Sequence, residues 1–206
     1  MIKLYGVKPS NYYSLAKAIL LEKGLAFEES TQPPSQEEDF LQKSPMGKMP
    51  AIEVDGVYIS ETFAIAAWAE RTQPEPALLP SDPIEAAKVI ELCCHLKLDV
   101  ELVARRLLPA AFFGATASDE VLETTEADLE KGMKAVARLF QGKPYAAGGS
   151  FTLADLFTFY TFGLSSSIIQ TIYSKDLLAG YPQISKLMSE LASRPSISQV
   201  EADKAA

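Results

Sequence analysis

Apolar and polar residues follow two alternating periods along the first part of the chain. Short apolar-rich runs are separated by segments with helical spacing. In the first such segment, Leu15, Ile19 and Leu20 fall on one helical face, and Gly24 supplies a stop signal. The pattern predicts strands over 2–6, 25–30, 51–54 and 57–60, and helices over 11–23, 36–43 and 63–71. The element order is therefore βαβαββα, a small α/β unit.

The last two strands and the last helix of this unit have clear boundary signals. Asp55-Gly56 separates the two strands and suits a two-residue primed turn, which predicts a hairpin. Ser60-Glu61-Thr62 directly precedes the helix and provides cap chemistry. The N-terminus of such a helix leaves backbone N–H groups unpaired and carries partial positive charge. It can therefore hold a carboxylate or a phosphate.

A proline-rich segment divides the chain. Three prolines within residues 72–80 exclude both a helix interior and a sheet ladder, and Ser81-Asp82-Pro83 then starts a helix. Helices are predicted over 84–108 with an interruption near Pro109, and over 118–140, 152–167, 175–179 and 182–193, followed by a polar tail, 196–206, expected to fray. We predict a first domain over 1–76, a linker over 77–83 and an all-helical domain over 84–206.

Composition and charge narrow the class of protein. With 206 residues, 48% hydrophobic and 22% charged, the chain has the composition of a soluble globular protein. No apolar run approaches the ~20 residues of a membrane span, and the strand-like N-terminus lacks a secretory signal, so a cytoplasmic location is expected. A net charge of −8 argues against nucleic acid as the main partner.

The cysteines and the histidine exclude several kinds of chemistry. Cys93 and Cys94 are adjacent, a spacing that strains a disulfide, and they lie within a helical pattern, which favours small buried side chains in a reducing compartment. No cysteine occurs in residues 8–14, so disulfide exchange there is not expected. His95 is the only histidine, which disfavours both a metal site and a Ser-His-Asp triad.

Three motifs occur in an order typical of one family. The first runs from Leu4 through Ser10 to Gly24, the second is Met49-Pro50 followed by the hairpin and Glu61-Thr62, and the third is Thr152-Leu153-Ala154-Asp155. Over nearly its whole length, the chain resembles the cytosolic glutathione transferases, in particular bacterial members similar to the serine-type tau, zeta and theta classes. The resemblance implies a thioredoxin-like βαβαββα domain followed by a helical bundle domain. Thr152 and Asp155 are expected to cap the central helix of that bundle.

The resemblance also implies which residues hold glutathione. Pro50 would form a cis peptide bond after Met49, so that the Met49 backbone pairs with the cysteinyl part of glutathione. Lys48 would reach the glycyl carboxylate. Thr62, in place of the more usual serine, would bind the γ-glutamyl carboxylate at a helix N-terminus, and Glu61 would orient the γ-glutamyl ammonium group.

Activation of the glutathione thiol is assigned to Ser10. A free thiol has a pKa near ~8.5, and lowering it by roughly 2 units requires about 2.7 kcal/mol of preferential thiolate stabilisation. A hydroxyl hydrogen bond to sulfur and a nearby helix N-terminus supply an amount of that order. Taken alone, Ser10 would be read as a helix cap. Tyr5, Tyr12 and Tyr13 are rivals for the catalytic role, because other classes use a tyrosine hydroxyl.

The acceptor substrate is expected to bind against the second domain. The candidate pocket residues are Tyr12, Tyr13, Arg105, Phe112 and Phe113, although the two phenylalanines fit plain core packing equally well. The resemblance implies a homodimer that uses glutathione as co-substrate, without a metal, in the detoxification of small, largely apolar electrophiles. Peroxide reduction or isomerisation at the same site, and a non-catalytic binding or assembly protein on this fold, remain alternatives.

Overall fold

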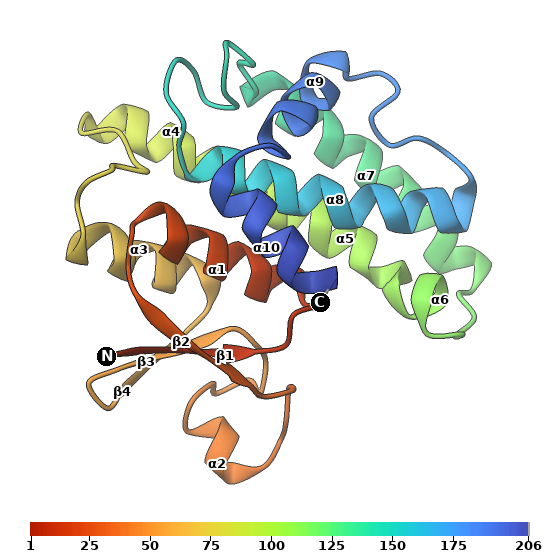
Figure 1. Cartoon of the computed structure of the whole chain (residues 1–206). Helices are drawn as coiled ribbons and strands as arrows, with labels where there is room; N and C mark the ends of the chain where they lie inside the picture. Colours follow the sequence, from red (N-terminus) through yellow and green to blue (C-terminus); the bar gives the residue numbers. More distant parts are fainter. Residues whose placement is uncertain (206) are drawn as a thin grey trace. The chain divides into compact units, whose positions relative to one another are not determined.

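The computed structural model of the protein describes residues 1–205 and divides them into two compact units (Figure 1). The sheet unit consists of Met1–Leu78 together with the described residues from Ser193 onward, and the helical unit is Leu79–Ala192. The final segment therefore groups with the N-terminal part of the chain, although it follows the helical unit in sequence. The domain boundaries at 76 and 84 stay a prediction.

The sheet unit is built on a four-stranded mixed sheet with the strand order β2-β1-β3-β4. The strand β1 (Ile2–Gly6) runs parallel to β2 (Phe27–Thr31) and antiparallel to β3 (Ala51–Val54), which pairs with β4 (Val57–Ser60). Together with the three helices between and after these strands, this arrangement confirms the predicted βαβαββα order.

The turn between β3 and β4 has the geometry that its two residues predict. Asp55 has a φ of 50° and Gly56 a φ of 82°, so both occupy the left-handed region that a primed turn requires. Val54 pairs with Val57, which leaves two residues in the loop. The predicted hairpin is therefore confirmed.

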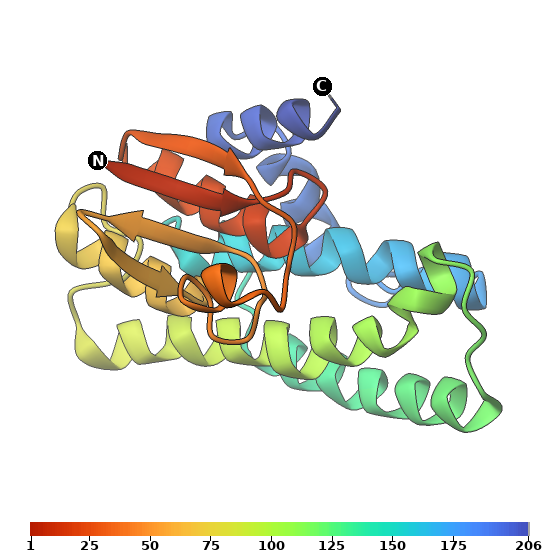
Figure 2. The same ribbon diagram turned by 90° about the horizontal axis from the view of Figure 1, so that it is seen from below.

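Helices α1 (Asn11–Glu22) and α3 (Thr62–Thr72) lie on one side of the sheet, and the short α2 (Glu38–Leu41) lies on the other (Figures 1 and 2). The core between the sheet and the two long helices is formed by fully buried aliphatic side chains, among them Leu4, Leu15, Ile19, Leu20, Ile52 and Ile65. Burial of this apolar surface is the main source of stability for the layer.

The C-terminal tail forms helix α10 (Pro195–Ala205), which packs on α1. Arg194 donates two hydrogen bonds to the carboxylate of Glu22, at 2.6 and 2.7 Å. The buried ammonium of Lys17 lies 2.6 Å from Asp203. The expectation of a fraying tail was wrong because its binding partners lie at the other end of the sequence, where the local polar pattern of the tail gives no sign of them.

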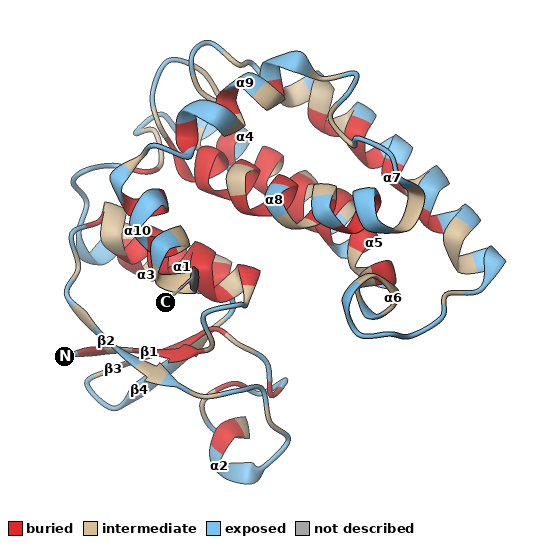
Figure 3. Ribbon diagram, turned by 45° about the vertical axis from the view of Figure 1, so that its right-hand side comes forward, coloured by how far each residue is buried: buried red, intermediate tan, exposed pale blue. Residues whose placement is uncertain are grey.

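The helical unit is arranged around one central helix. Its elements are α4 (Pro83–Cys94), η1 (His95–Glu101), α5 (Leu102–Ala104), η2 (Arg105–Leu107), α6 (Leu108–Phe112), α7 (Asp119–Leu139), α8 (Leu153–Tyr173) and α9 (Pro182–Leu191). Figure 3 shows that buried residues run along most of α8, in agreement with its apolar sequence. The overall fold class predicted from the sequence, a thioredoxin-like sheet domain plus a helical domain, is confirmed.

Local signals in the helical unit were partly misleading. The predicted helix at 175–179 is absent, because Asp176 accepts a hydrogen bond from the Leu178 N–H at 2.8 Å and so favours a turn. In contrast, α8 continues past its predicted end at 167, where the Ser167 hydroxyl donates to the Gly163 carbonyl at 2.8 Å and does not interrupt the helix. Both errors concern side chains that bond to nearby backbone.

The cap of α8 has the predicted structure. The Asp155 carboxylate accepts hydrogen bonds from the N–H groups of Thr152 and Ala146, both at 2.8 Å, and is fully buried. With the Thr152 side chain, it forms a capping box. Nearby in α4, Cys93 and Cys94 are free thiols, and burial raises the pKa of Cys93. The burial of Asp155 and of Cys93 agrees with structural roles, whereas Cys94 is half-buried, so the expectation of two buried cysteines is correct for Cys93 alone.

The long helical run after the linker contains a π-helical segment that the sequence does not reveal. In η1, His95–Glu101, the backbone is wider than in an α-helix, and α7 packs against it. Gly132 of α7 is at this contact: a Cβ on Gly132 would lie 2.0 Å from the carbonyl oxygen of Asp99. The close approach of the two helices therefore depends on the missing side chain.

Gly132→Ala is expected to destabilise the protein by about 2–3 kcal/mol, because α7 must move away from Asp99 to make room for a methyl group. The matched control is Gly163→Ala on the exposed face of α8, where an added Cβ meets nothing. That change should stabilise by up to about 1 kcal/mol through helix propensity. Urea unfolding of both variants measures the difference, and equal midpoints would contradict the argument.

Candidate functional site

Three segments of the sheet unit meet at one end of the sheet. In the strand register, Ala51 stands opposite both Tyr5 and Ser60. The end of β1, the start of β3 and the end of β4 therefore lie side by side, about 5 Å apart from strand to strand. Each leads directly into a predicted site segment: Ser10 after β1, Met49-Pro50 before β3, and Glu61-Thr62 after β4. The backbone N–H of Val7 donates to Met49 Sδ at 3.3 Å and joins two of these segments.

Ser10 is the N-cap residue of α1. Its Oγ accepts a hydrogen bond from the Tyr13 N–H at 3.4 Å, and its side chain is partly exposed. In this contact the hydroxyl acts only as an acceptor, so its proton is available to a further partner. The first turn of α1 contains no acidic residue, so the partial positive charge of the helix N-terminus is not offset there.

The peptide bond between Met49 and Pro50 is cis, which confirms the expectation drawn from the resemblance. Pro50 is buried, Met49 is half-buried and Lys48 is exposed. The structure therefore places the lysine where it is accessible to a soluble anion. Two further cis bonds precede Pro76 and Pro144, and no sequence signal pointed to them.

Glu61 and Thr62 form an unusual entry into α3. Glu61 has a φ of 71°, a region that costs non-glycine residues free energy and that is enriched at functional sites. Thr62 is the first residue of the helix, and its buried Oγ1 has no hydrogen-bond partner among the described residues. Since the first turn of α3 has no acidic residue either, a buried hydroxyl and a positive helix terminus are both available to an anion.

The tyrosine hydroxyls of β1 and α1 already have partners. Tyr5 donates to Glu53 at 2.5 Å, and Tyr13 donates to Glu29. Burial and these carboxylates raise the pKa of both tyrosines well above the ordinary value. Each hydroxyl is held as a neutral donor to a carboxylate, so neither is placed to give its proton to a ligand. Among the rivals to Ser10, Tyr12 is the one whose side chain is only half-buried.

Asn11 is a further candidate site residue, which the sequence analysis did not single out. It directly follows Ser10 at the first position of α1, is 9% exposed, and has a buried Nδ2 without a partner among the described residues. A buried amide that donates to nothing costs free energy unless a ligand completes it. The only signal in the sequence was the position itself, an amide donor next to the presumed catalytic hydroxyl.

The predicted acceptor-pocket residues belong to both compact units. Tyr12 and Tyr13 are in the sheet unit, whereas Arg105, Phe112 and Phe113 are in the helical unit. Arg105 Nε donates to the buried Glu101 at 2.9 Å. Phe112 and Phe113 are 46% and 76% exposed, which excludes the alternative that they fill the core of the helical unit. The pocket itself stays a prediction.

Residues 1–205 contain no cluster of three or more histidine, cysteine, aspartate or glutamate side chains arranged to hold a metal ion. No helix among the same residues combines the length and the apolar character that a membrane crossing requires.

Comparisons with known proteins agree with this geometry. Residues 4–77 match the family described as glutathione S-transferase, N-terminal domain, and residues 108–203 match its C-terminal domain. A glutathione S-transferase from Pseudomonas putida is 40% identical over 206 residues, covering 100% of this chain and 94% of that protein. A probable maleylacetoacetate isomerase from Caenorhabditis elegans is 30% identical over 74% of this chain and 69% of its own length.

Solved structures give the same result. A glutathione S-transferase from Methylobacterium radiotolerans, in complex with glutathione sulfonate, superposes with a TM-score of 0.78 at 26% identity. The match covers 97% of this chain and 93% of that one. Sequence and fold therefore point to one family over both units.

Proposed function

The chain belongs to the glutathione S-transferase family, and we propose that it transfers the thiolate of glutathione to small, largely apolar electrophiles. One observation carries the proposal: Ser10 lies shortly after the end of β1, Met49-Pro50 directly before β3, and the unpaired Thr62 hydroxyl shortly after β4, and the register places these three strand ends side by side. A relative named glutathione S-transferase, 40% identical over the full chain, supports the same activity.

The residues at the sheet end suit the separate parts of glutathione. Thr62 offers a buried hydroxyl and a helix N-terminus to the γ-glutamyl carboxylate, and the exposed Glu61 carboxylate can attract the ammonium group beside it. The Met49 backbone would pair with the cysteinyl unit, and Lys48 would meet the glycyl carboxylate. Solved structures of similar proteins, one in complex with glutathione sulfonate and one with bound glutathione, support glutathione as the co-substrate.

The chemical step begins when the glutathione thiol loses its proton to solvent and becomes the thiolate. Ser10 donates its hydroxyl proton as a hydrogen bond to sulfur and stays covalently unchanged, and the N-terminus of α1 adds partial positive charge. The thiolate electron pair forms a C–S bond with an electrophilic carbon. The electron pair of the broken bond leaves with a halide or similar group, or moves onto the adjacent atom of an activated double bond.

Asn11→Ala is expected to lower kcat/KM for conjugation roughly threefold to tenfold, because the Nδ2 donor of Asn11 would complete the polar contacts of the sulfur. Asn11→Asp should lower it further, since a carboxylate next to the thiolate raises the pKa of the thiol. The measurement is the pH dependence of kcat/KM. An Asn11→Asp profile that coincides with that of the unchanged protein would show that Asn11 does not face the sulfur.

Isomerisation is the second candidate function, and a specific observation favours it: four of the relatives at 26–30% identity are named maleylacetoacetate isomerases or probable ones. The same thiolate could add to a double bond, allow rotation and leave again, which regenerates glutathione. Peroxide reduction also starts from this thiolate. Separate assays with a maleyl substrate and an organic hydroperoxide distinguish these activities from conjugation.

The test of the proposed function is a calorimetric titration of glutathione into the full chain, followed by a chlorodinitrobenzene conjugation assay. Binding in the micromolar to millimolar range with turnover is the expected result. Absence of binding at millimolar glutathione would overturn the proposal in favour of a non-catalytic binding or assembly protein.

Thr62→Ala should weaken the binding of glutathione about tenfold, as the loss of a hydrogen bond to a charged group does.

We further propose the organisation typical of the family: a glutathione-binding domain over 1–76, a linker over 77–83, and an acceptor-binding domain over 84–206.

We also propose a homodimer. Exposed apolar side chains support it in each unit, namely Val57 and Tyr58 in the sheet unit and Ile90, Leu98 and Leu102 in the helical unit. A cytoplasmic location is proposed, supported by the two free cysteines. Sedimentation equilibrium tests the dimer.

A further inference from the structure

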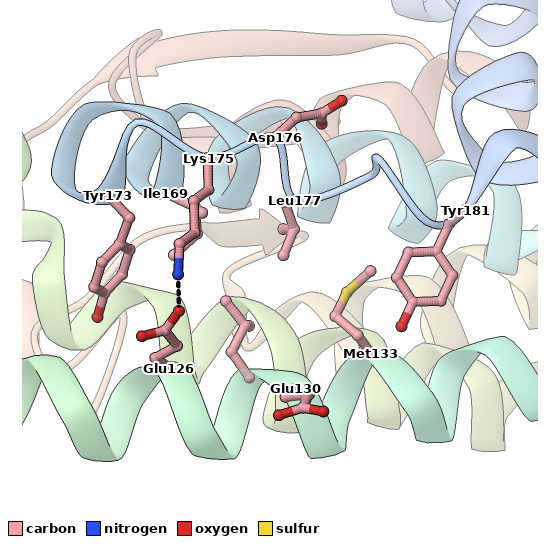
Figure 4. Close-up of a pocket in the computed structure, with 10 residues that line it drawn as sticks. Glu126, Glu130, Met133, Ile169, Tyr173, Lys175, Asp176, Leu177 and Tyr181 are labelled. Atoms are coloured by element: carbon pink, nitrogen blue, oxygen red, sulfur yellow. Dashed lines mark hydrogen bonds and ion pairs between the residues drawn. The ribbon is translucent and has the colours of Figure 1, made fainter.

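A cavity of about 200 Å³ lies within the helical unit, between α7, the C-terminal end of α8 and the loop 174–181 (Figure 4). We refer to it as the loop cavity. None of the residues that line it belongs to the predicted glutathione or acceptor sites. Neither the family resemblance nor the proposed reaction gives it a role.

The loop cavity is built by a chain reversal. Ser174 ends α8 in the left-handed region, with a φ of 54°, and turns the loop back over α7. Lys175 on the loop forms an ion pair with Glu126 on α7, and the Tyr173 hydroxyl donates to the Leu122 carbonyl at 2.7 Å. These contacts bridge α7 to the end of α8 and to the loop, so the space between them is enclosed on two sides.

The interior of the loop cavity is apolar. Leu129, Met133 and Ile169 are almost fully buried and line its inner wall. Figure 4 shows Leu177 reaching down from the loop and the Tyr181 ring lying close to Met133. Apolar walls with a few polar groups at the mouth are the usual composition of small-molecule sites, and the cavity volume of about 200 Å³ is below the roughly 300 Å³ at which their size range begins. The cavity therefore suits a compact ligand.

The charges at the mouth favour a cation. Three carboxylates line the cavity, those of Glu126, Glu130 and Asp176, against one ammonium, that of Lys175, which leaves an excess of two negative charges. Counting Lys134, which pairs with Glu130, the excess is one. Asp176 points away from α7 (Figure 4), so Glu126 and Glu130 are the carboxylates nearest the interior. Both of these carboxylates are paired, Glu126 with Lys175 and Glu130 with Lys134, but the Glu130 pair is exposed to solvent and therefore weak, so Glu130 is available to a second cation.

At the mouth of the loop cavity, a cationic side chain of the protein already lies over an aromatic ring. The ammonium of Lys175 lies 5.8 Å from the centroid of the Tyr173 ring, within the range of a cation–π interaction. Tyr181 supplies a second aromatic ring to the lining. Quaternary ammonium groups are commonly recognised by such rings together with a carboxylate.

We propose that the loop cavity is a second binding site, separate from the glutathione site, for a small organic cation with an apolar body. The body fills the space between Met133, Ile169 and Leu177. The cationic head lies at the mouth, next to the Glu130 carboxylate and the Tyr181 ring. The site depends on the folded helical unit alone and would exist whether or not the chain transfers glutathione.

The probe for this site is benzyltrimethylammonium, titrated into the full chain by isothermal calorimetry and by methyl NMR of Met133 and Leu177. We expect a Kd on the order of 0.1–1 mM and shifts confined to these methyl groups. Saturating glutathione should leave the Kd of the probe and the methyl shifts unchanged. If glutathione abolishes binding of the probe, the probe occupies the glutathione site and the proposal is overturned. Absence of binding at about 10 mM probe, ten times the upper limit of the expected Kd, would overturn it as well.

Two exposed variants test the chemistry without disturbing the core. Glu130→Gln should weaken binding of benzyltrimethylammonium roughly threefold to fivefold, as the loss of a partly exposed charge contact does. It should leave binding of the neutral isostere (2,2-dimethylpropyl)benzene unchanged. Glu123→Gln, on the same helix but outside the lining, is the matched control. Equal affinities in the two variants, or tighter binding of phenylacetate than of the cation, would overturn the assignment to cations.

Discussion

Ser10→Ala is expected to lower kcat/KM for conjugation roughly 10- to 150-fold, the range that corresponds to a hydrogen bond to a charged group, about 1.5–3 kcal/mol. Ser10 Oγ accepts from the Tyr13 N–H, so its proton is available to a ligand at the start of α1. Glutathione affinity should change by no more than about twofold, because the carboxylate contacts are assigned to Thr62 and Lys48 rather than to Ser10.

The decisive readout for Ser10 is the pKa of the bound thiol, followed by thiolate absorbance as the pH is raised. In Ser10→Ala the pKa should rise, since the hydroxyl stabilises only the ionised form. Ser10→Thr keeps a hydroxyl and should recover part of the activity, whereas Tyr12→Phe is the control for a tyrosine mechanism. Full activity in Ser10→Ala together with a large loss in Tyr12→Phe would transfer the catalytic role to the tyrosine.

The parts of the fold that were predictable are those decided by neighbouring residues. The Asp55-Gly56 turn, the cap at Asp82 and the capping box of Thr152 and Asp155 each depend on side chains within three residues of the backbone they bind. In these places local preference and tertiary structure agree, and the predicted elements are confirmed within a few residues.

The parts that were missed depend on partners far along the chain. Lys23 closes a predicted helix and gives no sign that its ammonium is buried, yet it binds Glu70 at 2.8 Å and the Pro76 carbonyl at 2.6 Å. Likewise, the π-helical segment η1 packs against α7, where Gly132 permits the close approach to Asp99, and nothing in the local sequence of η1 indicates this partner. Apolar periodicity reports the face that is buried, and it carries no information on which partner covers it.

In the candidate site, too, the sequence predicts what neighbouring residues decide and misses what distant partners decide. The family resemblance predicts Ser10, Met49-Pro50 and Thr62 as site residues, and all of them stand near element ends. It could not choose among the tyrosines, since the choice depends on carboxylates brought in by β2 and β3: Glu29 for Tyr13 and Glu53 for Tyr5. Those contacts arise only when the sheet is assembled.

The largest loss of stability is expected from Glu101→Gln in the core of the helical unit. Glu101 is fully buried, pairs with the buried Lys97, accepts from Arg105 Nε at 2.9 Å, and accepts from the Thr161 hydroxyl at 3.3 Å. Burial lowers the pKa of Lys97, and the Glu101 carboxylate opposes that shift. Removing the negative charge leaves a buried ammonium without compensation, which costs about 3–5 kcal/mol.

Urea unfolding monitored by circular dichroism measures this loss, and the chain provides its own control. Glu130→Gln removes the same kind of charge from an i,i+4 pair with Lys134, but that pair is exposed, so its loss should cost less than about 1 kcal/mol. Similar unfolding midpoints for the two variants would contradict the argument from burial.

A double replacement separates the contribution of the charge pair from that of the packing. In Lys97→Met with Glu101→Leu, no buried charge of the pair remains, and the apolar side chains replace much of the lost volume. Buried ion pairs exchanged for apolar residues are often neutral in stability or better, so the double variant should be more stable than Glu101→Gln, although Arg105 loses its carboxylate partner. If the double variant is instead the least stable of the three, the pair stabilises the fold through its own hydrogen bonds, and the cost assigned to the uncompensated ammonium is wrong.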